Sequence, residues 1–92
     1  MVNEVHCVHI LVKTQKDAKQ IKARVDSGED FGALAMEFST CPSKAQGGDL
    51  GWFGRGQMVK PFENASFNGQ PGDVTVCRTE FGWHVIKILE QR

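Results

Sequence analysis

The sequence predicts a single α+β domain that spans residues 1–92. A chain of 92 residues can close one modest hydrophobic core but not a second. The spacing of its apolar residues changes between the period of two typical of strands and the period of 3.6 typical of helices, in the order β, α, α, β, α, β, β. Because we find no internal repeat or linker-like stretch, we expect one compact unit to carry the function.

The composition is that of a globular protein without a charge bias. Hydrophobic residues make up 40% and charged residues 24% of the chain, and 11 Lys and Arg balance 11 Asp and Glu. This balance argues against general nucleic-acid binding, which requires clustered cations. Four lysines leave a local cationic patch open, although a solvated helix face is the simpler interpretation: Lys13, Lys16, Lys19 and Lys22.

The sequence also bears on location and redox state. It has neither the basic start and apolar stretch of a signal peptide nor a segment long enough to span a bilayer, so we expect a cytoplasmic protein. Cys7, Cys41 and Cys77 are odd in number and lack C-x-x-C spacing, which argues against a disulfide framework or a zinc ribbon. Reduced thiols are typical of a reducing compartment such as the cytoplasm.

The first half of the chain predicts one strand and two helices. Val5–Val12 is an apolar, β-branched run, which predicts a strand buried on both faces and places His9 deep in the fold. The first helix should begin at the capping box of Thr14 and Asp17 and end at Ser27-Gly28. The second should start at the N-cap Asp30 and carry an apolar stripe that packs on the sheet, namely Phe31, Leu34, Ala35 and Phe38.

The second half predicts a short strand, a short helix and two further strands. These are Leu50–Phe53, Pro61–Phe67, Val74–Arg78 and Trp83–Glu90. His84, like His9, lies in a strand that is otherwise apolar. An unsatisfied buried imidazole costs about 1–3 kcal/mol, so we expect the two histidines to bond to each other if their strands are adjacent.

The segment from Ser39 to Phe62 is too irregular for one helix or strand, and it contains five glycines and two prolines. Neither phosphate-loop motif is present, so the glycines more simply supply tight turns. The large apolar residues in and after this segment form either ordinary core or a pocket for a small apolar ring: Leu50, Met58, Val59, Phe62 and Phe67.

The sequence allows two other chemistries, a metal site and a cysteine nucleophile. Three histidines and three cysteines could bind zinc, but His6 and His9 should point to opposite faces of one strand, and we expect no metal or cofactor. Cys41 with His9 or His84 could be a nucleophile and its base. Cys41 could equally be a small buried apolar residue.

Three stretches, taken in order, resemble the parvulin family of peptidyl-prolyl cis/trans isomerases, in particular its small free-standing members: VHILVK, DFGALAMEFSTCPSKAQGGDLGWFGRGQMVKPFENASF and FGWHVIKI. The likeness extends from His9 to Ile88. It implies the parvulin (FKBP-like) fold, a four-stranded antiparallel sheet surrounded by about four helices in the order β-α-α-α-β-α-β-β. It also implies an extra helical turn near residues 43–46.

The resemblance implies two groups of site residues. The catalytic group comprises the paired histidines, the hydroxyl that supports them, and the position that the family fills with Cys or Asp, which are here His9, His84, Thr79 and Cys41. The substrate-binding group comprises Leu50, Gln57, Met58, Phe62 and Phe81. Some relatives carry Ser in place of Phe81, so a hydroxyl contact with substrate is expected to be absent.

The resemblance implies a folding helper that accelerates rotation about Xaa-Pro bonds in unfolded or flexible segments, without covalent catalysis. Phosphate-directed relatives carry clustered arginines after the first strand, whereas this chain has only Lys13 and Lys16 there. We therefore expect unphosphorylated proline-containing polypeptides as partners of a monomer that binds no nucleic acid. The same groove could instead retain such segments as a binding module or holdase, and a thiol enzyme that uses Cys41 is a third class.

Overall fold

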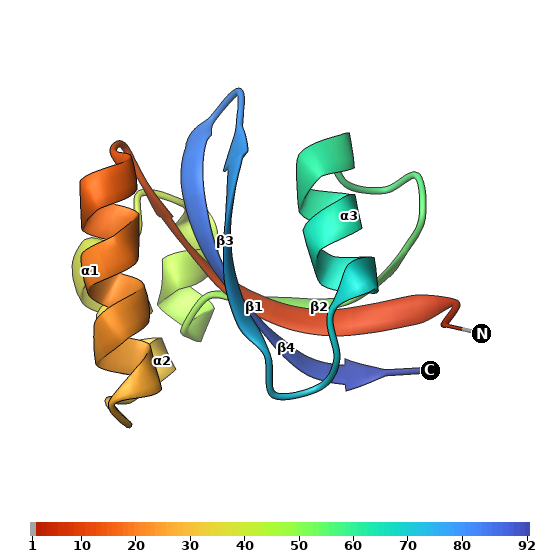
Figure 1. Cartoon of the computed structure of the whole chain (residues 1–92), viewed down its shortest axis with the longest axis horizontal. Coiled ribbons are helices and arrows are strands. Elements are labelled where there is room, and N and C mark those ends of the chain that lie inside the picture. The colour runs from red at the N-terminus through yellow and green to blue at the C-terminus, as the bar shows by residue number, and fades with distance from the viewer. Residues whose placement is uncertain (1) are drawn as a thin grey trace.

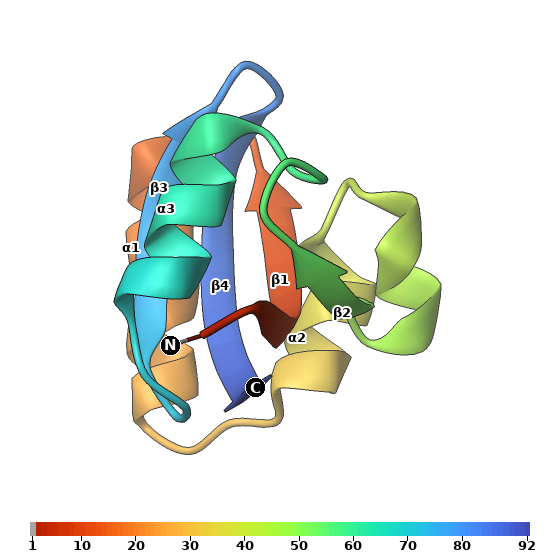
Figure 2. The same ribbon diagram turned by 90° about the vertical axis from the view of Figure 1, so that its right-hand side faces the viewer.

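A computed structural model describes residues 2–92. In chain order its elements are β1 (Glu4–Val12), α1 (Gln15–Asp26), α2 (Phe31–Phe38), the 3-10 helix η1 (Pro42–Gln46), β2 (Asp49–Gly54), α3 (Lys60–Asn68), β3 (Val74–Thr79) and β4 (Gly82–Gln91). The strands form one antiparallel sheet in the order β2-β1-β4-β3. Helices α1 and α2 cover one face of the sheet and α3 covers the other (Figures 1 and 2). The parvulin fold implied by the sequence is confirmed, and η1 is the expected extra helical turn.

β1 and β4 lie side by side at the centre of the sheet. In their register, His9 is opposite Ile86 and Leu11 is opposite His84. The two histidines are therefore diagonal neighbours on one face, a spacing that long side chains can bridge. The two strands are adjacent, as the pairing of the histidines requires.

Both predicted N-caps are present. Thr14 Oγ1 accepts the Asp17 N–H at 3.1 Å, and Asp30 Oδ2 accepts the Ala33 N–H at 2.8 Å. These bonds satisfy backbone donors that have no partner within the first helical turn. Both helices consequently begin where the sequence predicted.

The face of the sheet under α1 and α2 carries the first core cluster, which consists of Ile10, Val12, Ala18, Ile21, Val25, Phe31, Leu34, Ala35 and Val85. The prediction that Phe38 packs on the sheet is wrong, because its side chain is 37% exposed. Phe38 is the last residue of α2, where the chain turns back toward β1. Its ring lies 5.4 Å from the Arg24 guanidinium of α1.

The face under α3 carries the second core cluster, which consists of Val5, Cys7, Phe53, Phe62, Phe67, Ile86 and Ile88. This cluster resolves the choice between core and pocket. Phe62 and Phe67 are buried in it, whereas Leu50, Met58 and Val59 are only partly buried and pack at its margin.

Within residues 2–92, no helix is both long and apolar enough to cross a membrane.

The three cysteines are free thiols. Burial raises the pKa of the Cys77 thiol to about 11 and also raises the pKa of Cys7. Neither of these two thiols is therefore prepared to act as a thiolate nucleophile at neutral pH.

Candidate active site

A cavity of about 440 Å³ opens at the margin of the second core cluster. It is lined by His9, Leu11, Thr40, Cys41, Pro42, Leu50, Gln57, Met58, Val59, Phe62, Phe81 and His84. Every site residue implied by the resemblance lines this cavity except Thr79, which contacts His84. Strands, helices and loops that are far apart in sequence thus bring the predicted residues together.

The histidine pair is anchored from the β3–β4 turn. His9 Nδ1 lies 3.0 Å from His84 Nδ1, so the expected contact between the two rings is confirmed. His84 Nε2 lies 2.7 Å from Thr79 Oγ1, which in turn accepts the Phe81 N–H at 3.1 Å. The rings stack with their centroids 5.2 Å apart. Thr79 therefore supports the pair from outside the cavity.

On its other side the pair is connected to Cys41. His9 Nε2 lies 3.1 Å from Ser43 Oγ, and the Ser43 hydroxyl donates to Cys41 Sγ at 3.3 Å. Because the Ser43 hydroxyl hydrogen points to Cys41, Ser43 Oγ is left to accept the hydrogen on His9 Nε2. His9 Nδ1 then carries no hydrogen, so it accepts from the N–H at His84 Nδ1. The Thr79 hydroxyl then donates to His84 Nε2. This one assignment of donors and acceptors satisfies every hydrogen bond from Thr79 to Cys41 while both rings are neutral.

Both imidazoles are neutral at pH 7. Desolvation, followed by repulsion from His84, lowers the pKa of His9 to about 4. Desolvation also lowers the pKa of His84. A group that does not change its charge near neutral pH is better suited to orient its neighbours than to transfer protons. We interpret the pair as an orienting group that tunes the polarity beside Cys41.

Phe62 lies edge-on to both histidines. Its ring centroid is 5.5 Å from that of His9 and 5.2 Å from that of His84, at interplanar angles of 83° and 82°. The Phe62 side chain is only 3% exposed. Phe62 is thus both a core residue and the floor of the cavity, whereas the partly exposed Met58 belongs to the wall.

Hydrogen bonds to the backbone of β1 hold two loops against this strand. The buried Ser39 Oγ accepts the N–H groups of Leu11 at 3.0 Å and Cys41 at 3.2 Å. The His9 N–H donates to the Gly48 carbonyl at 2.9 Å. A Cβ on Gly48, whose φ is +84°, would collide with the His9 carbonyl oxygen. Glycine is therefore required for this close approach.

Several residues of the site were not predicted from the sequence, namely Leu11, Thr40, Pro42 and Ser43. The signal for Ser43 was its place two residues after Cys41, at the start of a helical turn. Gln57 was predicted and does line the cavity, but its Oε1 accepts the Gly54 N–H at 3.0 Å. Its amide oxygen therefore closes the loop after β2.

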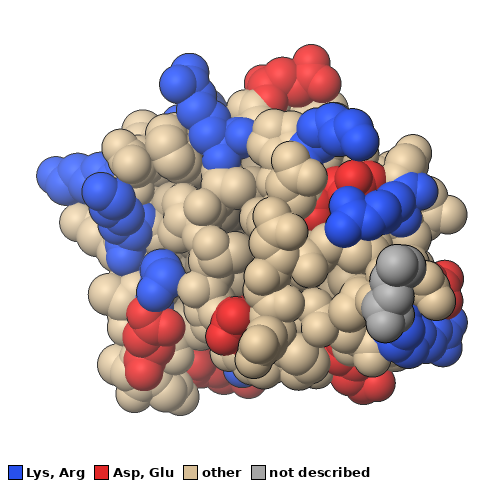
Figure 3. Space-filling view, turned by 45° about the vertical axis from the view of Figure 1, so that its right-hand side comes forward, with Lys and Arg blue, Asp and Glu red and all other residues tan. Residues whose placement is uncertain are grey.

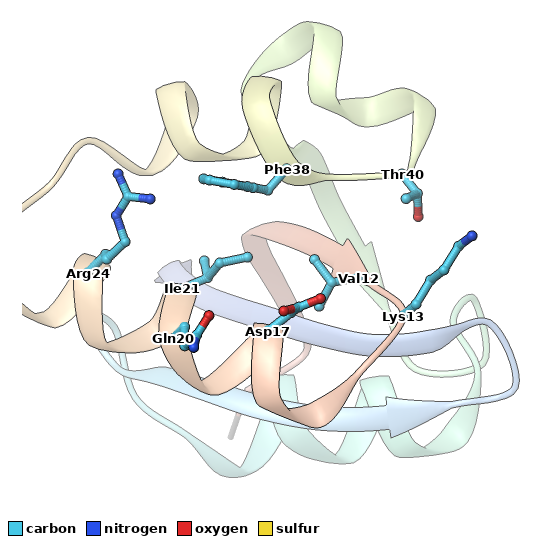
Figure 4. A pocket seen from close by; sticks show the side chains of 8 residues that line it. All are labelled: Val12, Lys13, Asp17, Gln20, Ile21, Arg24, Phe38 and Thr40. Atoms are coloured by element: carbon cyan, nitrogen blue, oxygen red, sulfur yellow. The ribbon is translucent and has the colours of Figure 1, made fainter.

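A second hollow, of about 390 Å³, lies beside α1 and the end of α2 (Figure 4). Its lining residues are Val12, Lys13, Asp17, Gln20, Ile21, Arg24, Phe38 and Thr40. It contains none of the predicted site residues.

His6 lies apart from the histidine pair. Its Nε2 is 2.7 Å from Asp49 Oδ1, and its ring centroid is 5.6 Å from that of Trp52. Among residues 2–92, no three His, Cys, Asp or Glu side chains gather into a group that could hold a metal ion.

Comparison with known families identifies this arrangement. The sequence profile of the PPIC-type PPIase domain matches residues 1–92. The chain belongs to this family. NmPin, the parvulin of Nitrosopumilus maritimus, is 44% identical and superposes on the PPIase domain with a TM-score of 0.88, covering 98% of this chain and 99% of its own. CsPin from the archaeon Cenarcheaum symbiosum is 49% identical, with a TM-score of 0.87 over 98% of this chain and 95% of its own.

The PPIase domain also resembles part of longer proteins. It is 48% identical over 90 residues to the foldase protein PrsA of Geobacillus kaustophilus, a match that covers 96% of this chain and 32% of that protein. The crystal structure of PrsA from Bacillus anthracis is 35% identical, with a TM-score of 0.95 over 99% of this chain and 43% of its own. The chain spans about a third of the length of the curated relatives that it matches.

Proposed function

We propose that this chain is an active peptidyl-prolyl cis/trans isomerase, and that it acts on Xaa-Pro bonds in unfolded or flexible polypeptide segments. The cavity of about 440 Å³, where apolar walls meet a neutral imidazole pair, is the observation that carries this proposal. A proline ring is small and apolar and its nitrogen carries no N–H, so the walls can enclose it without burying an unpaired donor. The foldase relatives support a role in protein folding.

The reaction needs no bond between protein and substrate. Rotation about Xaa-Pro breaks amide resonance, with a barrier of about 18–20 kcal/mol, and takes tens to hundreds of seconds unaided. Lowering that barrier by about 5 kcal/mol would accelerate it between a thousand- and ten-thousandfold. A cavity that excludes water disfavours the polar planar amide relative to the less polar twisted state.

The lining residues have two roles: some hold the proline ring, and others set the polarity beside the carbonyl group. Leu50, Met58 and Phe62 hold the ring on the apolar side. Cys41 and the histidine pair set the polarity beside the rotating carbonyl. Thr79 fixes the orientation of His84 through their 2.7 Å contact. One side of the bond is then held while the other side turns.

We further propose that the substrates are unphosphorylated. The lining contains no Lys or Arg among the described residues, so no cationic fork faces the substrate. On the face shown in Figure 3, Lys and Arg lie mainly toward the margins, around a largely uncharged centre. The single domain over residues 1–92, the monomeric state, the lack of nucleic-acid binding and the cytoplasmic location stay predictions.

Exchange between the cis and trans signals of a proline peptide at equilibrium tests the activity. Substoichiometric PPIase domain should increase the exchange rate measured by NMR exchange spectroscopy. Peptide binding without faster exchange would favour the binding module or holdase instead.

Replacement of Cys41 separates this mechanism from a thiol enzyme. We expect Cys41→Ala to keep a measurable fraction of isomerase activity, because the barrier is lowered by grip and desolvation. Cys41→Asp should also be active, since the family uses either residue at this position. Complete loss of activity in well-folded Cys41→Ala protein would indicate a nucleophilic cysteine.

A further inference from the structure

Glu63 on α3 is a buried carboxylate that the proposed mechanism does not use. Its side chain is 1% exposed, which is unusual for Glu. Its Oε1 accepts the Gly56 N–H at 2.6 Å, and its Oε2 lies 3.3 Å from Arg55 Nη1 and 3.5 Å from Lys60 Nζ. The Gly56 N–H, followed by the nearby cations, holds the pKa of Glu63 below its usual range although desolvation opposes the shift. The buried carboxylate is therefore charged at neutral pH and satisfied by its neighbours.

The shortest of these contacts is made to the loop that forms one wall of the cavity. Gly56 is followed directly by three residues that line the cavity, namely Gln57, Met58 and Val59. Gly56 has φ of +88°, a conformation that favours glycine, and this brings its N–H to the carboxylate. Glu63 itself follows Phe62, the floor of the cavity. One side chain thus connects the wall to the floor.

We propose that Glu63 is a positioning residue for the proline pocket. It holds the loop between β2 and α3 (residues 55–59), which carries Met58, against α3. The pocket then has its binding form before substrate arrives. A second bond, from the Gly54 N–H to Gln57 Oε1, closes the same loop at its start. A loop that is already ordered loses less conformational entropy when substrate binds, so binding is tighter. This inference rests on the proposed isomerase function.

The positioning role predicts a specific kinetic signature. If substrate binds only when the loop is in place, the apparent affinity falls in proportion to the competent fraction, while the bound complex reacts at its usual rate. A loop in place about a tenth of the time would raise KM about tenfold and leave kcat unchanged. A merely structural role would lower the folded fraction, which reduces the apparent kcat and leaves KM unchanged.

The experiment compares two variants of the whole chain. Glu63→Leu cannot accept the Gly56 N–H, whereas the amide oxygen of Glu63→Gln can. We expect Glu63→Leu to raise KM, and the Kd of a proline peptide, at least about fivefold with kcat within about twofold of the wild type. Glu63→Gln should recover most of that affinity. Ser66→Ala is the matched control, because Ser66 is buried on the same helix and has no hydrogen bond to the loop.

Hydrogen exchange gives a second measurement, and its result for the wild type does not depend on whether a variant folds. The Gly56 amide should exchange slowly in the wild type and quickly in Glu63→Leu, while β1 keeps its protection. An unprotected Gly56 amide in the wild type would overturn the proposal even if Glu63→Leu does not fold. An unchanged KM in folded Glu63→Leu, or a Glu63→Gln variant as weak as Glu63→Leu, would also overturn it. If the wild type binds proline peptide, Glu63→Leu weakens that binding, and yet the wild type accelerates no cis/trans exchange, the isomerase activity is refuted and the positioning role is retained.

Discussion

Under α1 and α2, the sheet is closed by the apolar side chains of the first core cluster. Under α3, the second core cluster ends at two imidazoles and opens into the cavity. Phe62 belongs to both the second cluster and the cavity, whereas Leu34 belongs only to the closed face. We infer that one face mainly stabilises the fold, and that the other is left incomplete so that a substrate proline can fill it.

Truncation on the closed face should give the largest effect on stability. Leu34 is 3% exposed in the first core cluster, so Leu34→Ala should lower the free energy of unfolding by about 2–5 kcal/mol. The kcat/KM of the folded protein should stay unchanged, because Leu34 does not line the cavity. Urea denaturation and the isomerase assay measure the two quantities. A large loss of kcat/KM in folded protein would show that the two faces are coupled.

Acid should weaken the α3 face through its histidines. The pKa of His9 is about 4 in the folded protein against 6.5 for the ordinary side chain, so the unfolded chain binds the proton more readily. The stability from the neutral ring is complete above pH 6.5 and is lost as the pH falls toward 4, by about 3 kcal/mol. The lowered pKa of His84 acts in the same direction. Denaturant titrations between pH 7 and 4.5 would contradict this if the unfolding free energy stayed constant.

Replacing one histidine of the pair by an apolar residue should lower stability by about 1–3 kcal/mol, because the remaining ring loses its buried partner. Replacing both His9 and His84 should cost less than the sum of the single losses, since their Nδ1 atoms are 3.0 Å apart. Strictly additive losses in a double-mutant cycle would show that the contact is absent in solution.

Met58 should show the reverse of the Leu34 pattern. Met58→Ala should lower kcat/KM at least about tenfold, or about 1.4 kcal/mol of transition-state stabilisation, and the unfolding free energy by less than about 2 kcal/mol. Phe62→Ala should lower both kcat/KM and the unfolding free energy, because the Phe62 ring lies in the core and also forms the floor of the cavity. If Met58→Ala mainly unfolds the domain and leaves the folded protein fully active, Met58 is core and not a pocket wall.

Local signals determined much of this fold from the sequence alone. The side-chain caps Thr14 and Asp30 start their helices through bonds to backbone three residues away, and such bonds need no knowledge of the rest of the chain. The apolar runs around His9 and His84 likewise specified two buried strands. The resemblance to parvulins then supplied the site residues, although Thr79 lies behind the cavity lining.

Only the tertiary structure decided how the polar groups meet. His9 contacts a residue 75 positions away and another, Ser43, that is 34 positions away. Such contacts depend on strand register and loop path, which the local pattern does not specify. The same holds for Phe38, whose apolar spacing predicted burial but which is the last residue of its helix, where the chain turns back toward β1. It also holds for Glu63, which would be read as a surface residue in a sequence but is enclosed once the β2–α3 loop closes over it.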